Sequence, residues 1–413
     1  MTFELLLALA ILVVVLIGHL GIWIALYNRI NATGLKRTTI KRIEKAIVLA
    51  CGTIPILLLL IEFTQLGFVG VLNGLLGVTS AWSRLTIAYS IVAGMFGILL
   101  APLWIMDRPQ FATAKDRVKV TSAEDLNLLK QTRESREIYV QGGSFRKMAL
   151  LPGNQIVSLQ RNCKRLKFKH LPKDISGLRV AHLSDVHLTG QLSNAFYRLA
   201  TDWIAEQCPD MIILSGDIVD NEHALQQLQP VFDGLSAPLG MYFVLGNHDR
   251  RLVDPTIVCR KLCELGWTDL GKEQARRQYQ GTTLRLIGNE QPWFQRSSSP
   301  HEFQSRESSP LGEWTIGVSH SPDQFAWGIR NRCQLMLCGH THGGQIRFPI
   351  VGPIVAPSWY GTRYASGVFE KNETVMHVSR GVSGVHPFRW GCLPEVSVLE
   401  LTSLYWDQNA FIP

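Results

Sequence analysis

Three long apolar stretches lie in the first quarter of the chain. They run from Phe3 to Tyr27, from Ala46 to Phe63 and from Leu85 to Met106, and each contains at most one charged residue. As helices rising about 1.5 Å per residue, stretches of this length suit a bilayer core that is about 30 Å thick. The pattern predicts a transmembrane region of about three helices over residues 1–106.

The segment between the second and third stretches leaves the number of spans open. Residues 64–84 are apolar but rich in glycine. They are compatible with a surface loop, a re-entrant piece or a fourth span. Three spans are the simplest interpretation.

Lys and Arg flank the apolar stretches asymmetrically. Six lie between the first two stretches and four lie in residues 107–119 after the third, whereas only Arg84 directly precedes the third and none precedes the first. Because short basic loops stay cytoplasmic, three spans predict an external amino terminus and a cytoplasmic remainder, in a multi-pass protein of the cell inner membrane. A fourth span would place the remainder outside. The first stretch is too long, and lacks the basic start and cleavage-like site, for a removable signal peptide.

The rest of the chain changes character twice. Residues 107–152 are polar and mixed in charge, and they predict a linker or small collar. From residue 153 to 413, short apolar runs that are typical of buried strands alternate with helical stretches. The clearest runs are Leu178–Leu183, Met211–Leu214 and Met241–Leu245, and the clearest helical stretches are Asn194–Glu206 and Pro255–Leu265. This alternation predicts an α/β domain.

Charge and cysteine content narrow the classes of partner. The formal net charge is +8, which would suit nucleic acid, but much of the excess lies beside the apolar stretches. No basic groove interleaved with aromatic residues is evident, so no nucleic acid is expected as a partner. The eight cysteines form no C-x-x-C pair, which agrees with a reducing compartment rather than a disulfide framework.

Polar clusters follow the apolar runs of the α/β region. Because α/β sheets place their sites at the carboxyl ends of strands, these side chains are expected to meet. The clusters are LSDVHL, LSGDIVDN, LGNHDR, VSHSPD and CGHTHGGQ. They contribute Asp185 and His187, Asp217 and Asp220, Asn247, His248 and Asp249, His320, and His340 and His342.

The chemistry of these side chains indicates a metal site. Carboxylate, imidazole and amide oxygen suit Mn, Fe or Zn, and no cysteine cluster competes for a softer ion. Two divalent ions about 3.5–4 Å apart activate water and clamp a phosphate for in-line displacement. Each cluster alone has a structural alternative as a turn or helix cap. Five such coincidences in this order are improbable.

The ordered motifs D-x-H, GDxxD, GNHD, H and GHxH resemble the calcineurin-like metallophosphoesterase superfamily. Three downstream features, Val378–Gly384, Arg389 and Leu393–Leu401, look like the closing segment of its bacterial membrane-anchored phosphodiesterase branch. The resemblance implies a four-layer α/β/β/α sandwich, here preceded by the helical transmembrane region. It also implies a metal-dependent phosphoric ester hydrolase with two divalent ions.

The resemblance assigns a role to each matching position. The first ion would be held by Asp185, His187, Asp217 and His342, and the second by Asp217, Asn247, His320 and His340, with Asp217 bridging. His248 would donate a proton to the leaving oxygen or stabilise it. Outside the metal shell, Asp220 is expected to fix a histidine tautomer, and Asp249 is a candidate to orient the His248 ring.

These expectations combine into one functional hypothesis. The chain is interpreted as a membrane-anchored two-metal phosphoesterase that cleaves a phosphodiester or pyrophosphate bond, with a lipid-linked substrate such as UDP-diacylglucosamine favoured by the anchor. The alternatives are a cytoplasmic-face nuclease, a general phosphatase and an inactive membrane scaffold. A scaffold would be expected to lack ligands, yet all seven metal positions and His248 are present. No obligate protein partner is inferred.

Two further features have structural interpretations. The Ser/Pro-rich stretch 296–312 predicts a flexible surface loop, and its position before His320 also allows a lid. His182, inside an apolar run, is predicted to be a packed core histidine rather than a ligand.

Overall fold

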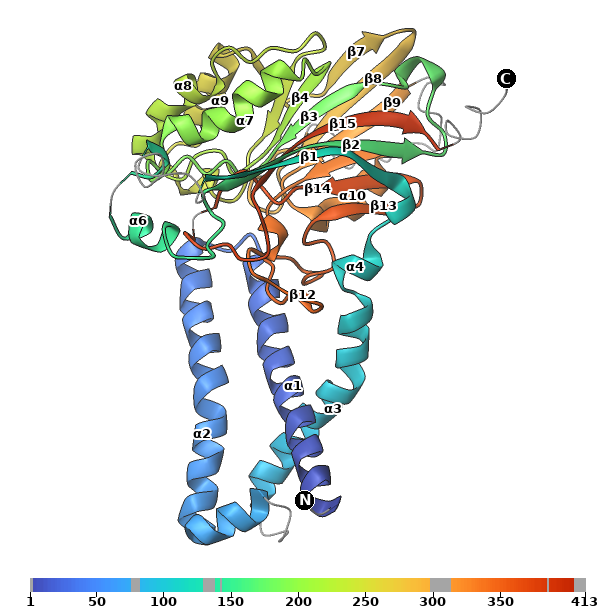
Figure 1. The fold of residues 1–413 in the computed structure, drawn as a ribbon. Coiled ribbons are helices and arrows are strands. Elements are labelled where there is room, and N and C mark those ends of the chain that lie inside the picture. Colours follow the sequence, from blue (N-terminus) through green and yellow to red (C-terminus); the bar gives the residue numbers. More distant parts are fainter. Residues whose placement is uncertain are drawn as a thin grey trace. The chain divides into compact units, whose positions relative to one another are not determined.

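A computed structural model of the chain describes residues 3–75, 82–128, 138–141, 143–297, 313–384 and 386–404 (Figure 1). The chain divides into two compact units, Met1–Phe111 and Ala112–Pro413. Most of the stretch 296–312 lies outside the described residues, so its interpretation as a loop or lid stays a prediction.

The first unit contains three long helices within the described residues: α1 (Phe3–Asn31), α2 (Arg37–Leu75) and α3 (Arg84–Met106). All three are long and apolar enough to cross a membrane. Helix α2 continues through residues 64–75 of the ambiguous segment, with non-helical backbone at Gly67, where φ is 70° and ψ is 178°. Residues 76–81 of that segment are not described.

Buried polar side chains inside these helices have partners within the first unit. His19 on α1 contacts the Tyr89 hydroxyl, and its Nε2 lies 2.9 Å from the Cys51 carbonyl oxygen. The Glu62 carboxylate accepts from the Ser83 backbone N–H at 3.0 and 3.1 Å. Burying an unpaired polar group in hydrocarbon costs roughly several kcal/mol of free energy. The hydrogen bonds therefore make these residues compatible with apolar surroundings.

The second unit is built on two large sheets. The first has seven strands in the order β1-β2-β15-β3-β4-β5-β6, and the second has six in the order β13-β14-β10-β9-β8-β7. Strands of the first sheet are β1 (Val118–Asn127), β2 (Ser158–Phe168), β15 (Glu395–Ser403), β3 (Arg179–Leu183), β4 (Met211–Ser215), β5 (Met241–Val244) and β6 (Trp267–Asp269). Strands of the second are β13 (Gly367–Lys371), β14 (Thr374–Val378), β10 (Leu335–Cys338), β9 (Glu313–Ser319), β8 (Thr282–Asn289) and β7 (Ala275–Tyr279). A two-stranded hairpin pairs β11 (Arg347–Phe348) with β12 (Gly352–Pro353).

Helices cover the outer faces of the two sheets. The main ones are α7 (Asn194–Glu206), α8 (Leu228–Phe232), α9 (Thr256–Glu264) and α10 (Phe325–Arg330). Shorter helices are α4 (Pro109–Ala112) and α6 (Gly143–Ala149), and the 3-10 turns are η1 (Lys115–Arg117), η3 (Lys173–Ile175), η4 (Glu222–Gln227), η5 (Asp249–Arg251), η6 (Pro322–Gln324) and η7 (His342–Gly344). Figure 1 shows α7, α8 and α9 together beside β3 and β4.

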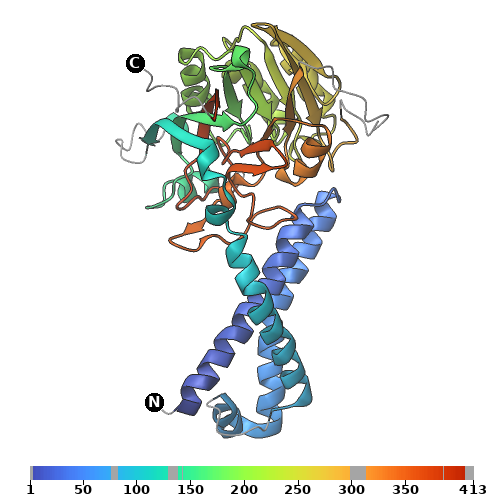
Figure 2. The same cartoon turned by 90° about the vertical axis from the view of Figure 1, so that its right-hand side faces the viewer.

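Three apolar clusters account for the layering. One cluster joins the inner faces of both sheets and includes Ile213 and Val244 from the first and Ile316 and Leu337 from the second. A second cluster packs the other face of the first sheet against α7, α8 and α9, and a third packs the second sheet against α10. The predicted four-layer α/β/β/α sandwich is therefore confirmed (Figure 2).

The apolar runs predicted the central elements closely. The runs that begin at Leu178, Met211 and Met241 form β3, β4 and β5, which pair in parallel. The helical stretch Asn194–Glu206 is α7, and Pro255–Leu265 contains α9. His182 is fully buried on β3 as predicted, and its ring contacts His377 and Ser215 at 2.9 Å each.

The predicted boundary near residue 153 differs from the structural division. Residues 118–127 of the expected collar form β1, an edge strand that pairs antiparallel with β2, and α6 lies in the same segment. An edge strand pairs with one neighbour only, and the side chains of β1 are mostly exposed. Its sequence therefore need not show the apolar run that identified the central strands. The second unit accordingly begins at Ala112 rather than near residue 153.

Candidate metal centre

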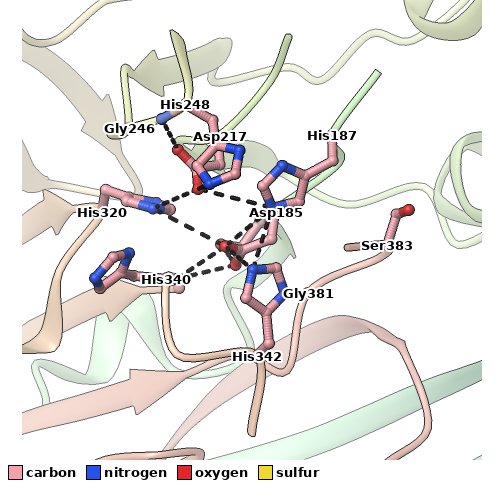
Figure 3. Close-up of polar contacts among 12 residues, drawn as sticks. Asp185, His187, Asp217, Gly246, His248, His320, His340, His342, Gly381 and Ser383 are labelled. Carbon is pink, nitrogen blue, oxygen red and sulfur yellow. Dashed lines mark hydrogen bonds and ion pairs between the residues drawn. The ribbon is translucent and has the colours of Figure 1, made fainter. Parts of the chain in front are cut away.

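The polar clusters occupy the carboxyl ends of five strands. Asp185 and His187 follow β3, Asp217 follows β4, Asn247 and His248 follow β5, His320 follows β9, and His340 and His342 follow β10. These strands come from both sheets, so their ends converge from the two inner layers of the sandwich. The structure brings seven of these side chains into one neighbourhood, and Asn247 lies between Gly246 and His248 beside it (Figure 3).

The backbone at this neighbourhood is unusual. Five non-glycine residues there have left-handed φ angles: Asp185 at 51°, His187 at 48°, Asp217 at 53°, His340 at 73° and His342 at 50°. Such conformations cost roughly 1–3 kcal/mol each and persist where surrounding structure enforces them, most often at functional sites. Their clustering indicates that the rest of the fold offsets the cost of these strained conformations, which direct the side chains toward one another.

One glycine permits the close approach of two of these loops. A Cβ atom at Gly246 would lie 2.3 Å from Asp217 Oδ1 and 2.5 Å from the Asp217 backbone nitrogen. The loop after β5 therefore packs against the loop after β4 with no room for a side chain. This contact places Asn247 and His248 beside Asp217.

Asp185, His187, Asp217 and His342 form the first group of potential ligands. Their ligand atoms all lie within 4.8 Å of one another. His187 Nε2 lies 3.1 Å from His342 Nε2 and 3.7 Å from Asp217 Oδ2, and His342 Nε2 lies 3.5 Å from Asp185 Oδ1. Two imidazole nitrogens and two carboxylates thus face a common point, as the first predicted ion requires.

Asp217, His320 and His340 form the second group, again within 4.8 Å. His320 Nδ1 donates to the Ser215 carbonyl at 2.7 Å, so in a neutral ring Nε2 carries the lone pair. That lone pair points toward Asp217 Oδ2 at 3.1 Å. In the protonated ring Nε2–H would donate to Asp217, and in the neutral ring the two facing acceptors would suit a cation between or beside them.

Three buried atoms strengthen this interpretation. Asn247 Oδ1 and His340 Nε2 have no hydrogen-bond partner, and His320 Nε2 faces the carboxylates of Asp217 and Asp185 at 3.1 and 3.9 Å. Buried polar atoms without partners are rare in proteins, and each calls for an explanation such as an ion. These three atoms are the non-bridging ligands expected for the second ion, so the donor set fits a divalent cation.

The electrostatics around Asp217 and His320 favour positive charge, whereas burial lowers the pKa of His340 and His342 well below its usual range and keeps these two rings neutral. Burial disfavours the charged His320 ring, but Asp217 and Asp185 outweigh this effect and raise its pKa to about 9. Burial acts to raise the pKa of Asp217 too, yet the His320, His248 and His187 rings hold that pKa well below its usual range. Because metal ions compete with protons for such ligands, a pocket that holds a proton this tightly is also suited to a cation.

Asp220 links two of the histidines. Its Oδ1 lies 2.7 Å from His187 Nδ1, and its Oδ2 lies 2.9 Å from His248 Nδ1. An Nδ1–H held in this way leaves Nε2 of His187 free to bind metal. Arg251 on η5 reaches the same carboxylate at 2.6 Å and also contacts His248 Nε2. Arg251 had no assigned role from the sequence, although its spacing of three residues from His248 suits one face of a turn.

Asp249 has a different role from the one expected. The carboxylate that contacts the His248 ring is Asp220, whereas Asp249 accepts backbone N–H groups from Ile218, Val219 and Gly246 at 2.8–3.0 Å. Asp249 is fully buried, and burial with the nearby Asp217 charge raises its pKa to about 7. It therefore ties the loops after β4 and β5 together instead of orienting the ring.

A buried arginine supports the other side of the site. Arg389 is fully buried, its guanidinium donates to the Arg380 carbonyl at 2.8 Å and to the Ser383 carbonyl, and it lies 3.2 Å from His342 Nδ1. Its position in the closing segment was the only sequence signal for it. Arg389 thereby holds the loop that carries Gly381 and Ser383 against Asp185 and His342 (Figure 3).

Comparison with known proteins agrees with the class of protein that the fold and the site indicate, a metal-dependent phosphoesterase. The model of the calcineurin-like phosphoesterase family matches residues 178–344. The chain belongs to this family and is a metal-dependent phosphoric ester hydrolase.

Three relatives extend the match beyond that region. The chain is 30% identical to uncharacterized metallophosphoesterase YkuE of Bacillus subtilis, over 58% of this chain and 84% of the relative. It is 29% identical to phosphodiesterase YaeI of Escherichia coli, over 54% and 82% respectively. It is 35% identical to UDP-2,3-diacylglucosamine pyrophosphatase LpxG of Chlamydia trachomatis, over 56% and 85%.

Proposed function

We propose that this chain is a multi-pass membrane protein whose second unit is a two-metal phosphoesterase, and that it hydrolyses a phosphodiester or pyrophosphate bond in a lipid-linked substrate. The observation that carries the two-metal part is the sharing of Asp217 by two ligand groups. Asp185, His187, Asp217 and His342 would hold one ion. Asp217, Asn247, His320 and His340 would hold the other.

When bound, two such ions supply charge that activates water and stabilises the displaced phosphate oxygens. The residues of the chain do the positioning. Asp220 holds the His187 and His248 rings by their Nδ1 atoms, which aims both Nε2 atoms toward Asp217 at 3.7 and 4.0 Å. His248 Nε2, which contacts the Arg251 guanidinium in this structure, would exchange that contact for the leaving oxygen and deliver a proton to it.

The protonation of His248 depends on the substrate. Burial lowers the pKa of His248 to about 4, against the opposing effect of Asp217 and Asp220. An anionic phosphate beside the ring favours its protonated form. Substrate binding would therefore raise the pKa of His248 toward the range that a general acid needs.

The lipid-linked substrate is supported by two separate observations. Three helices of the first unit are apolar and long enough to cross a membrane, which would keep the metal centre near the headgroups. The relative LpxG carries a name that specifies a lipid-linked pyrophosphate substrate. Both favour UDP-2,3-diacylglucosamine or a similar lipid phosphate over a soluble monoester.

A substrate panel tests this proposal. The purified full chain is assayed with Mn²⁺ against a nucleotide-linked lipid in vesicles, a soluble diester, single-stranded DNA and a phosphomonoester, with Asp217→Asn as the inactive control. The vesicle substrate is expected to be cleaved fastest because the anchor raises the local concentration of cleft and headgroup. Preference for DNA would favour a nuclease, preference for the monoester a general phosphatase, and no hydrolysis at all a scaffold.

The expected orientation has its own test. The basic residues between α1 and α2 and after α3 favour a cytoplasmic second unit. A reporter that is active only outside the inner membrane is expected to stay silent after Pro413 and to work when inserted at residues 76–81. The opposite pattern would indicate inverted insertion, and activity at both positions would indicate an additional span.

A further inference from the structure

The second unit has one surface segment with an unusual density of exposed apolar side chains. In the described residues of this unit, eight of the thirteen exposed large hydrophobic residues lie in residues 346–360 or at position 390. They are Ile346, Phe348, Ile350, Val351, Val355, Trp359, Tyr360 and Trp390. We call this set the apolar rim. Concentrations of this kind mark interaction surfaces rather than ordinary protein surface.

Backbone pairing and ring contacts connect the rim. Strands β11 and β12 form its hairpin, and the Phe348 ring lies edge-on to Trp390 with 5.6 Å between centroids. Ile346 bridges to Trp390, and the Arg347 N–H donates to the Trp390 carbonyl at 2.8 Å. At the hairpin tip Ile350 is 93% exposed. Figures 1 and 2 show this hairpin projecting from the body of the second unit.

The charge of the rim narrows the choice of partner. Residues 345–361 contain a single charged side chain, Arg347. Its guanidinium turns inward, donating to the Gly343 carbonyl at 3.0 Å and to the Ser366 hydroxyl at 2.8 Å. A protein interface usually carries a polar rim, whereas a surface of Ile, Val and Phe bordered by Trp and Tyr is typical of the membrane interface.

The rim is attached to the metal centre at both ends. It begins after His342, through the turn η7, and at the other end the Pro357 backbone hydrogen-bonds to the His340 ring. His340 and His342 are the two histidines of the GHTH motif. The rim is therefore joined directly to the segment that carries both of these candidate metal ligands.

The chain also reaches the second unit beside the rim. The Ala114 N–H donates to the Val368 carbonyl on β13 at 2.8 Å, and Ser366, just before β13, binds Arg347 of the rim. Helix α3 ends at Met106. Residues 107–113 connect the two and extend to at most about 25 Å. A bilayer that holds the end of α3 would therefore lie within this reach of Ala114.

We propose that the apolar rim inserts into the interface of the bilayer that anchors the chain, so that the metal centre operates at the level of the phosphate headgroups. The occupant is bilayer lipid. This inference rests on the membrane anchoring in the proposed function but not on the identity of the substrate.

Lipid photo-crosslinking tests the proposal on the full chain. The photoreactive residue p-benzoylphenylalanine is introduced at Ile350, or at Val253 as the matched control, and each protein is reconstituted in phosphatidylethanolamine–phosphatidylglycerol vesicles with isotope-labelled acyl chains. Val253 is 95% exposed, like Ile350 at 93%, but lies outside the rim. Lipid adducts at position 350 are expected to exceed those at position 253 on the order of tenfold, because only an inserted side chain meets acyl chains persistently.

The outcomes separate this inference from the proposed function. Equal lipid labelling at the two positions, in protein that floats with the vesicles, would overturn insertion while leaving the anchoring intact. An adduct at position 350 to a second copy of the chain would overturn it in favour of a self-interface. Protein that fails to float would overturn the anchoring and the insertion together. Metal content of both labelled proteins, measured before reconstitution, confirms that the second unit is folded.

Discussion

Asp217→Asn is expected to lose at least one bound ion and nearly all hydrolysis of a soluble diester such as bis-p-nitrophenyl phosphate. Asp217 is common to the two proposed ion sets, whereas the further group of His187, Asp220 and His248 is joined by the hydrogen bonds of Asp220. An amide nitrogen cannot replace a bridging carboxylate oxygen. Substitutions just outside a metal shell typically cost roughly 10–100-fold, so removal of the bridge should exceed about 100-fold. Elemental analysis and initial rates with added Mn²⁺ measure both effects.

Two aspartates serve as graded controls. Asp220→Asn keeps the shape of a residue that contacts His187 and His248 without belonging to either proposed ion set, and it should fall within the outer-shell range of roughly 10–100-fold. Asp233→Asn changes an exposed side chain beyond α8 and should be neutral. Two ions at full activity in Asp217→Asn would remove Asp217 from the centre. A loss in Asp233→Asn as large as in Asp217→Asn would show that the assay reports general damage.

Local sequence predicted the centre well because its ligands follow apolar runs. The runs at β3, β4 and β5 are nearly all buried, and Asp185, Asp217 and Asn247 follow the strand ends by two or three residues. Parallel pairing brings those strand ends to one edge. The apolar runs and the polar residues that follow them were thus enough to predict that these side chains meet, and their role as metal ligands stays a prediction. Their division between two ions came from the resemblance to a family.

The contacts around the ligands were not readable in this way. Asp249 is adjacent to His248 in the sequence and Asp220 is 28 residues away, yet Asp220 faces the ring while Asp249 faces the backbone of the loop after β4. Arg389 and His342 are 47 residues apart, with no periodic pattern to connect them. The sequence did not predict the edge strand β1 or the apolar rim, for a related reason. Exposure depends on what covers a segment, and apolar character alone does not specify this.

His248→Gln is expected to keep both ions and to lose turnover by about 10²–10⁴-fold on a diester with a poor leaving group. His248 belongs to neither ion set in the proposal, because its Nδ1 faces Asp220 and its Nε2 lies 4.0 Å from Asp217 Oδ2. Gln retains a polar side chain of similar reach but cannot deliver a proton near neutral pH. Rates are measured for an alkyl and a p-nitrophenyl diester alongside metal content.

The leaving group decides whether His248 acts as an acid. A p-nitrophenolate leaves without protonation, so its diester should lose much less than the alkyl diester if proton delivery is the role. Equal losses on both substrates with both ions retained would indicate that the ring only stabilises charge. Loss of metal would instead make His248 a ligand. His223→Gln, an exposed histidine on η4, should leave both rates unchanged.

Because Asp220 holds His248 and His187 alike, Asp220→Asn should reduce both metal affinity and the leaving-group discrimination. That joint effect distinguishes a shared positioning carboxylate from two independent roles.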